Sequence, residues 1–122
     1  MNESEYQRLL LLEAPKRLQD VRLFRRNVGA VKVAITEDKT RWTRFGIPGQ
    51  ADLYCLVRGG KIIECEVKKL GGRLSKEQEA WRDFCQSWSV PWLLLKPLKD
   101  EATDATIARW IGEIAALCSL KR

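Results

Sequence analysis

One stretch most restricts what this chain can fold into, residues 45–68, with the sequence FGIPGQADLYCLVRGGKIIECEVK. A Gly/Pro loop leads into Asp52 and an apolar run, a Gly-Gly pair marks a reversal, and a second run ends in Glu-Cys-Glu-Val-Lys. Because side chains alternate across a strand, Glu64, Glu66 and Lys68 lie on one face. The stretch therefore predicts two strands joined by a tight turn, with ionisable groups gathered on one face.

This grouping of charges indicates a binding site. Two acids and a lysine on a largely apolar sheet are unfavourable unless they bind something. Asp52 and Glu66 can hold Mg²⁺ or Mn²⁺ together with the backbone carbonyl of Val67. Lys68 can then orient or deprotonate a water molecule and steady the charge that develops on a phosphodiester. The alternative is an ordinary solvated sheet face, because Glu-x-Lys is a common tripeptide.

The length of the turn provides a test of this site. If the Gly-Gly pair formed a two-residue turn, Asp52 would lie opposite Val67 and point away from Glu66. A three-residue loop, at 58–60 or 59–61, places Asp52 on the same face as Glu66. We therefore predict an odd-length loop or a bulge with a glycine at positive φ.

Length and composition narrow the classes of protein. A chain of 122 residues suits one domain, 1–122. The absence of histidine excludes Ser-His-Asp and Cys-His chemistry, and four cysteines without a CxxC pair make structural zinc unexpected. We expect these thiols to be reduced and mostly buried.

The partners and location are predicted from charge and hydropathy. The 22 basic and 16 acidic residues give a formal charge of +6, which suits a polyanion such as DNA. No apolar run approaches the roughly 20 residues that a membrane span needs. The acidic N-terminus does not resemble a secretory signal. We therefore expect no membrane partner and a cytoplasmic location, in a bacterium or a phage-infected host.

The rest of the chain predicts alternating helices and strands, and hence an α/β fold. A capping box is expected at Ser75 and Gln78. Before the two site strands, the predicted elements are a helix at Ser4–Ala14, strands at Val21–Phe24 and Ala30–Ile35, and a polar loop at Thr36–Gln50; Ser4 caps the helix, and a boundary or kink is expected near Pro15. After the site strands, the predicted elements are a helix from Ser75 to about Trp88, a strand at Pro91–Leu95 and a helix at Asp100–Leu120. The helix from Ser75 is expected to bury Trp81, Phe84, Cys85 and Trp88.

Three segments together, GIPGQAD, IIECEVK and GGRLSKEQEAW, resemble the virus-type replication-repair nuclease (VRR-NUC) domain of the PD-(D/E)XK nuclease superfamily. The resemblance runs from Glu3 to about Leu95 and includes Arg-Asn-Val-Gly at 26–29. The proline that usually precedes the aspartate is Ala51 here, a position without a chemical role. The resemblance implies a restriction-endonuclease-like core with a central mixed sheet flanked by helices, in the order α-β-β-β-α-β-α.

The resemblance also implies roles for individual residues. It implies that Asp52, Glu66 and Lys68 are catalytic. Glu3, with Glu5 as the fallback, would assist the metal from the first helix, although acids are favoured at any helix start. Gln78 would support the site, which is compatible with its role in the capping box.

The implied activity is metal-dependent, structure-specific cleavage of branched DNA, because stand-alone members of the family resemble homodimeric nucleases of four-way (Holliday) junctions, found in phages and bacteria and acting in DNA repair. The first helix or the final helix, with Trp110, is a candidate dimer surface. A less selective flap or duplex nuclease and a non-catalytic nucleic-acid-binding module remain as alternatives. The residues expected to contact phosphates are Arg22, Arg25, Arg26, Lys32, Arg41, Arg44, Lys69 and Arg73.

Overall fold

The computed structural model describes residues 1–119, apart from the side chain of Phe45. The predicted helix end at Leu120 lies outside the described residues. The elements are α1 (Glu3–Arg17), β1 (Val21–Arg25), β2 (Gly29–Ala34), β3 (Thr40–Phe45), β4 (Leu53–Val57), β5 (Lys61–Val67), α2 (Lys76–Ser87), β6 (Trp92–Leu95) and α3 (Thr103–Cys118).

Four strands form a mixed sheet in the order β1-β4-β5-β6. The β1–β4 and β4–β5 pairs are antiparallel, whereas β5 and β6 are parallel. The parallel pair follows from chain length, because α2 lies between these strands and supplies the crossover that parallel strands need. The expectation of an α/β fold with a mixed sheet flanked by helices is confirmed, and without β2 and β3 the order of elements is α-β-β-β-α-β-α.

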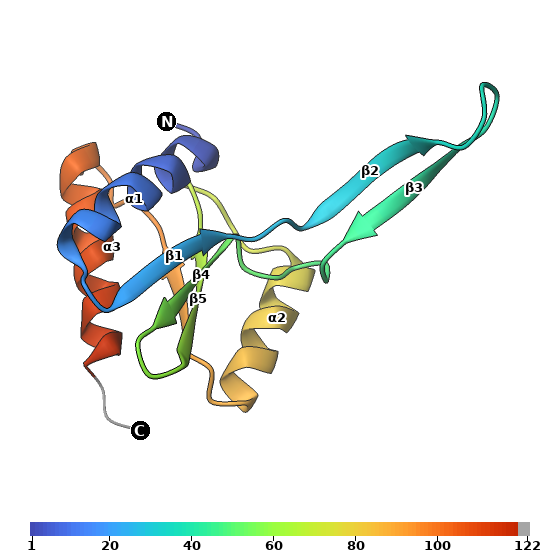
Figure 1. Ribbon diagram of the computed structural model, residues 1–122. Coiled ribbons are helices and arrows are strands. Elements are labelled where there is room, and N and C mark those ends of the chain that lie inside the picture. The colour runs from blue at the N-terminus through green and yellow to red at the C-terminus, as the bar shows by residue number, and fades with distance from the viewer. Residues whose placement is uncertain (120–122) are drawn as a thin grey trace.

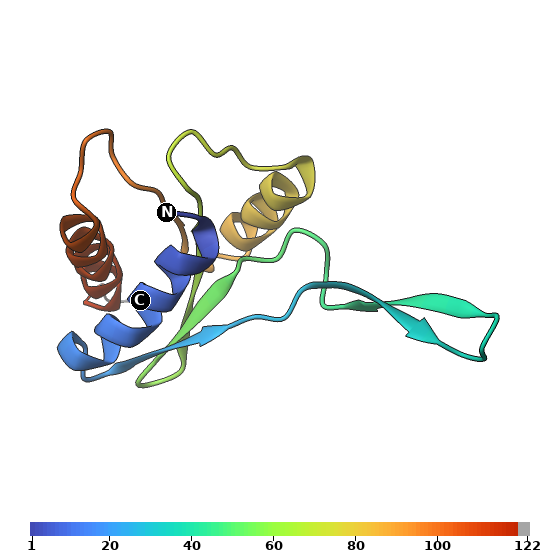
Figure 2. The ribbon, with the colours of Figure 1, turned by 90° about the horizontal axis from the view of Figure 1, so that it is seen from above.

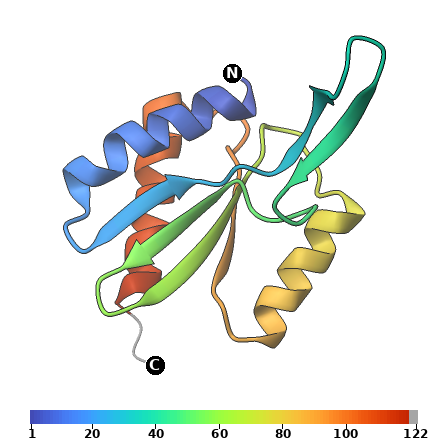
Figure 3. The same ribbon diagram turned by 45° about the vertical axis from the view of Figure 1, so that its right-hand side comes forward.

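One face of the sheet carries the hydrophobic core. Helices α1 and α3 pack together against this face, and α2 lies apart from them (Figures 1 and 3). Trp110 and Leu10 are fully buried, so neither is available for the predicted dimer contact. The largest fully buried apolar side chains are Trp110, Leu10, Leu53, Ile63, Leu95, Ile114 and Val67.

The opposite face of the sheet is covered only in part. Of the predicted buried stripe on α2, Cys85 is buried and Trp81 half-buried, but Phe84 and Trp88 are 47% and 71% exposed. The prediction was wrong for these two because the rings of Trp81, Phe84 and Trp88 follow one another along the helix surface instead of entering a core. The neighbouring sheet face therefore leaves large apolar side chains exposed, namely Phe24, Leu56, Ile62 and Leu94.

Helix α1 departs from its predicted ends. Asn2, and not Ser4, caps it, accepting a hydrogen bond of 2.9 Å from the amide of Glu5. Pro15 lies inside the helix, which continues to Arg17, so the predicted boundary was also wrong. The proline removes one hydrogen bond in the last turn, and packing of the buried Ala14 against the core holds that turn in place. Within residues 1–119, no helix combines the length and the apolar character that crossing a bilayer requires.

Strands β2 and β3 form a separate two-stranded ribbon that extends away from the body (Figures 1 and 2). The predicted loop at Thr36–Gln50 is therefore wrong over residues 40–45. Most side chains of the ribbon are exposed, and a strand without a buried face has no apolar alternation by which its sequence could be recognised. Along the chain, the residues of the ribbon come between β1 and β4.

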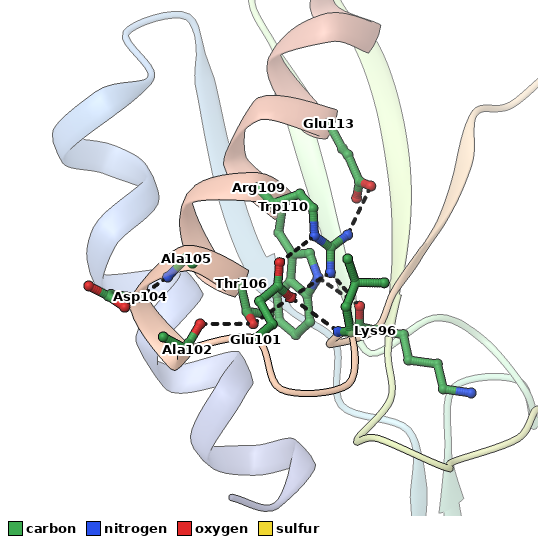
Figure 4. Close-up of polar contacts among 10 residues, drawn as sticks. Lys96, Glu101, Ala102, Asp104, Ala105, Thr106, Arg109, Trp110 and Glu113 are labelled. Carbon is green, nitrogen blue, oxygen red and sulfur yellow. Dashed lines mark hydrogen bonds and ion pairs between the residues drawn. The ribbon is translucent and has the colours of Figure 1, made fainter.

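The start of α3 is held by a polar cluster (Figure 4). Glu101 accepts hydrogen bonds from the hydroxyl of Thr106 at 2.7 Å and from Nε of Arg109 at 2.9 Å. These bonds, led by the one from Arg109, lower the pKa of Glu101 to about 2. Arg109 also donates to the carbonyl of Lys96 at 2.7 Å, while Nζ of Lys96 donates to the carbonyl of Gly72 at 2.8 Å. The cluster thus connects α3 to the end of β6 and to the loop after β5.

Candidate active site

The turn between β4 and β5 has the predicted odd length. Val57 pairs with Lys61, so the loop comprises residues 58–60, and its two glycines have φ of 98° and 100°. The register continues to the pair Leu53 and Cys65. One step further along the same register, Asp52 lies opposite Glu66, so their side chains share a face. The predicted three-residue loop with glycine at positive φ is confirmed.

Asp52 and Glu66 are connected across the two strands. The backbone amide of Asp52 donates to Oε2 of Glu66 at 3.3 Å. The amide of Val67 donates to Oδ2 of Asp52 at 3.2 Å. The two carboxyl groups also lie close enough for each to shift the pKa of the other. Each carboxyl group is therefore oriented by the backbone of the other strand.

Asp52 and Glu66 repel each other when both carboxyl groups are ionised. Glu66 is almost fully buried, and burial together with the charge of Asp52 raises its pKa to about 8. Burial also raises the pKa of Asp52, and the charge of Glu3 adds to this effect. The amide of Val67 and the charge of Lys68 act in the opposite direction on Asp52. The pair would be relieved by a positive charge placed between the two carboxylates.

Lys68 and Gln78 border the carboxylate pair. Nζ of Lys68 lies 4.0 Å from Oε1 of Glu66, and its side chain is 12% exposed. Nε2 of Gln78 donates to the same oxygen at 2.7 Å, while Oε1 of Gln78 accepts from the amide of Ser75 at 2.8 Å. One amide group therefore both caps α2 and holds Glu66, so the two roles considered for Gln78 coexist.

The structure separates Glu3 from Glu5. The carboxylate of Glu5 accepts from the amide of Asn2 at 3.0 Å and is part of the cap of α1. Oε2 of Glu3 instead accepts from the amide of Lys69 at 3.3 Å, just beyond the end of β5. Of the two candidates, Glu3 is the one whose charge raises the pKa of Asp52.

Arg26 is partly buried and paired with Glu64, while its predicted phosphate contact stays a prediction. It forms two hydrogen bonds to Glu64, of 2.7 and 2.8 Å, and a third to the carbonyl of Ala51 at 3.1 Å. Nε1 of Trp81 also donates to Glu64 at 2.9 Å, and the guanidinium group lies 4.8 Å from the ring centre of Tyr54. Glu64 lies on the same face as Glu66 but belongs to this structural cluster. No pattern in the sequence indicated that Arg26 would pair with Glu64.

The other predicted phosphate-binding side chains are exposed. Arg25 ends β1, where it pairs with Leu53, and Lys69 and Arg73 lie in the loop after β5. Arg22 lies towards the opposite end of β1 and donates to the carbonyls of Gln19 and Val21. The remaining three, Lys32, Arg41 and Arg44, are on the β2–β3 ribbon.

The loop from the ribbon back to the site is tightly fitted, which the sequence did not indicate. Gly49 has a φ of 87°, and a Cβ there would overlap the backbone carbonyl of Glu77 in the first turn of α2. On the other side, the amide of Arg26 donates to the carbonyl of Asp52 at 2.8 Å. Both chain segments that join the ribbon to the body therefore meet at Asp52.

The residues present fit a divalent cation of the Mg²⁺ or Mn²⁺ type. Both ions prefer oxygen ligands, and two carboxylates that repel each other supply them. Within the described residues, no three acidic or cysteine side chains are grouped as ligands of one ion. The set is therefore two carboxylates, with the carbonyl of Val67 as the predicted third ligand. Mg²⁺ sites built on one or two carboxylates commonly keep several water ligands.

Comparisons of the chain with protein-family models, with curated proteins and with solved structures each found no match. The function is therefore inferred from the geometry of the site and from the resemblance of the motifs.

Proposed function

We propose that this protein is a Mg²⁺- or Mn²⁺-dependent endonuclease that hydrolyses phosphodiester bonds in branched DNA, with a VRR-NUC-type PD-(D/E)XK site. The observation that supports this most is the convergence of Asp52 and Glu66. Two carboxyl groups from adjacent strands each accept a hydrogen bond from the backbone of the other strand, and one of them is almost fully buried. Such a pair is costly in a purely structural setting and is suited to binding a cation that a phosphate can approach.

Each side chain has a role in this proposal. Asp52 and Glu66 hold the cation, which when bound reduces charge on the scissile phosphate and positions water. Gln78 fixes the orientation of Glu66 through its hydrogen bond of 2.7 Å. Lys68, 4.0 Å from Glu66, orients or deprotonates the attacking water and stabilises the developing negative charge. Glu3, held by the amide of Lys69, acts from α1 at the edge of the site.

The preference for four-way junctions comes from the resemblance, and a homodimer would supply the two symmetric cuts that a junction requires. The burial of Leu10 and Trp110 favours a second candidate, a monomeric nuclease that nicks flaps or duplex DNA. Sedimentation at working concentration separates the two candidates, because paired cutting needs a dimer.

The test is cleavage of a labelled four-way junction, a flap and a plain duplex, with Mg²⁺, with Mn²⁺ and with EDTA. Asp52→Ala and Lys68→Ala are expected to abolish metal-dependent cleavage while far-UV circular dichroism stays unchanged. Arg58→Ala is the matched control, because this exposed residue lies in the β4–β5 turn, at the other end of the hairpin from Asp52.

Robust cutting by both site variants would refute the assignment of the residues. Salt-dependent DNA binding without cleavage of any substrate would instead identify a non-catalytic binding module.

A further inference from the structure

The exposed β2–β3 ribbon is a candidate surface for binding a partner molecule outside the chain. Nearly all of its side chains are exposed, including Trp42 at 68% and Val31 at 44%. An isolated two-stranded ribbon is at most marginally stable in water, since neither face is buried. The ribbon extends clear of the sheet and helices in both views (Figures 1 and 2).

One face of the ribbon combines positive charge with an aromatic ring. Lys32 pairs directly with Trp42, and Ala30 pairs directly with Arg44. Because paired residues and every second residue along a strand share a face, these four side chains lie together. Along the two strands the charged side chains are all basic, namely Lys32, Arg41 and Arg44. The acidic Glu37 and Asp38 lie in the turn at the tip.

The ribbon is also connected directly to the candidate active site. The segment that enters it passes Arg26, whose amide donates to the carbonyl of Asp52. The segment that leaves it passes Gly49, which fits against α2, and reaches Asp52 two residues after Gln50. Six residues of β2 at the usual rise span about 20 Å. This length corresponds to about six base pairs of duplex.

We propose that the ribbon lies in the major groove of a DNA duplex next to the scissile phosphate. The face formed by Ala30, Lys32, Trp42 and Arg44 is turned towards the DNA. This inference rests on the proposed nuclease function and adds where the duplex lies relative to the site. A two-stranded ribbon has the width that the major groove admits. Lys32 and Arg44 bind phosphates, the small Ala30 allows close approach, and Trp42 packs on sugars and base edges.

A second copy of the chain is a weaker match for this surface. Two ribbons, or a ribbon and the basic surroundings of the site, would bring like charges together, whereas DNA neutralises them. The basic side chains along the two strands also fit a duplex, because phosphates line the groove.

The experiment measures binding of a fluorescent four-way junction, and of one of its arms as plain duplex, in EDTA at several salt concentrations. Lys32→Ala and Arg44→Ala are each expected to reduce the slope of log affinity against log salt by about one. Trp42→Ala is expected to weaken binding about tenfold. The matched controls, Arg58→Ala and Trp88→Ala, remove an equally exposed cation and ring elsewhere and are expected to bind as the wild type.

A footprint identifies the groove. Dimethyl sulfate modifies guanine N7, which faces the major groove. The wild type is expected to protect guanines over about six base pairs beside the cleavage position. The Trp42→Ala variant is expected to lose this protection. All variants lie outside the core, and thermal unfolding checks that each is folded.

The outcomes separate this inference from the proposed function. If the wild type cuts DNA but the ribbon variants bind and protect like it, the inference is overturned and the nuclease proposal stands. If protection depends on the ribbon but no cleavage occurs, the placement of the ribbon in the major groove stands, while the nuclease proposal fails. If Trp42→Ala converts a dimer into a monomer without changing the footprint, the ribbon is an arm between copies and the inference is overturned.

Discussion

The buried pair of Arg26 and Glu64 gives the sharpest prediction. Replacing Arg26 with Ala leaves the carboxylate of Glu64, whose side chain is 3% exposed, without its two charged hydrogen bonds. Removing one partner of a buried ion pair typically costs about 3–5 kcal/mol. The hydrogen bond from Trp81 remains, and a neutral donor of this kind contributes about 1 kcal/mol. We therefore expect Arg26→Ala to lower the free energy of unfolding by about 3 kcal/mol, the lower end of that range.

The assay is urea denaturation at pH 7, followed by far-UV circular dichroism. Arg25→Ala is the matched control, because this neighbouring arginine is exposed, and its removal is expected to change stability by less than about 0.5 kcal/mol. The double variant Arg26→Met with Glu64→Gln is expected to recover most of the loss, since it leaves no unpaired buried charge. A loss below about 1 kcal/mol for Arg26→Ala, together with weaker DNA binding, would refute the structural role and restore the predicted phosphate contact.

Three further predictions concern the carboxylate pair. Gln78→Glu keeps the cap of α2 but adds a carboxylate beside Glu66, so cleavage is expected to fall at least tenfold in a nuclease assay while the melting temperature changes by a few degrees. Gly49→Ala forces a Cβ against the carbonyl of Glu77 at a φ of 87°, and urea denaturation should show a loss of about 2 kcal/mol or more, with reduced cleavage. In EDTA, the pKa of Glu66 is about 8 in the folded protein and 4.5 in the unfolded chain, so the folded state binds the proton more tightly. The free energy of unfolding is therefore expected to fall as the pH rises between these two values. Mg²⁺ should counteract this fall at pH 8. The same profile in Glu66→Gln would show that another group is responsible.

The sequence was sufficient for the parts of the fold that depend on local periodicity. The hairpin of β4 and β5 follows from a Gly-Gly reversal and a two-residue repeat. Its three-residue turn does not follow from these positions: it was predicted because Asp52 and Glu66 can share a face only with a loop of odd length. Gln78 could be placed because a capping box fixes the third residue of a helix.

The features that were not predicted depend on contacts between residues far apart in the sequence or on the solvent exposure of side chains. Arg26 and Glu64 are separated by 38 positions, and no local rule pairs them. The described side chains of β3 are exposed or half-buried, and its alternation is carried mainly by polar residues, so its sequence resembles that of a loop. The spacing of Phe84 and Trp88 shows a continuous helix face, but spacing alone cannot show whether a sheet covers it.

The placement of the ribbon between β1 and β4 has an evolutionary consequence. Its two ends leave and rejoin the body at almost one point, so the arm can grow, shrink or change its surface without moving the strands that position Asp52 and Glu66. Substrate choice and bond cleavage would then be able to diversify independently, with the arm as the variable part and the carboxylate pair as the constant one.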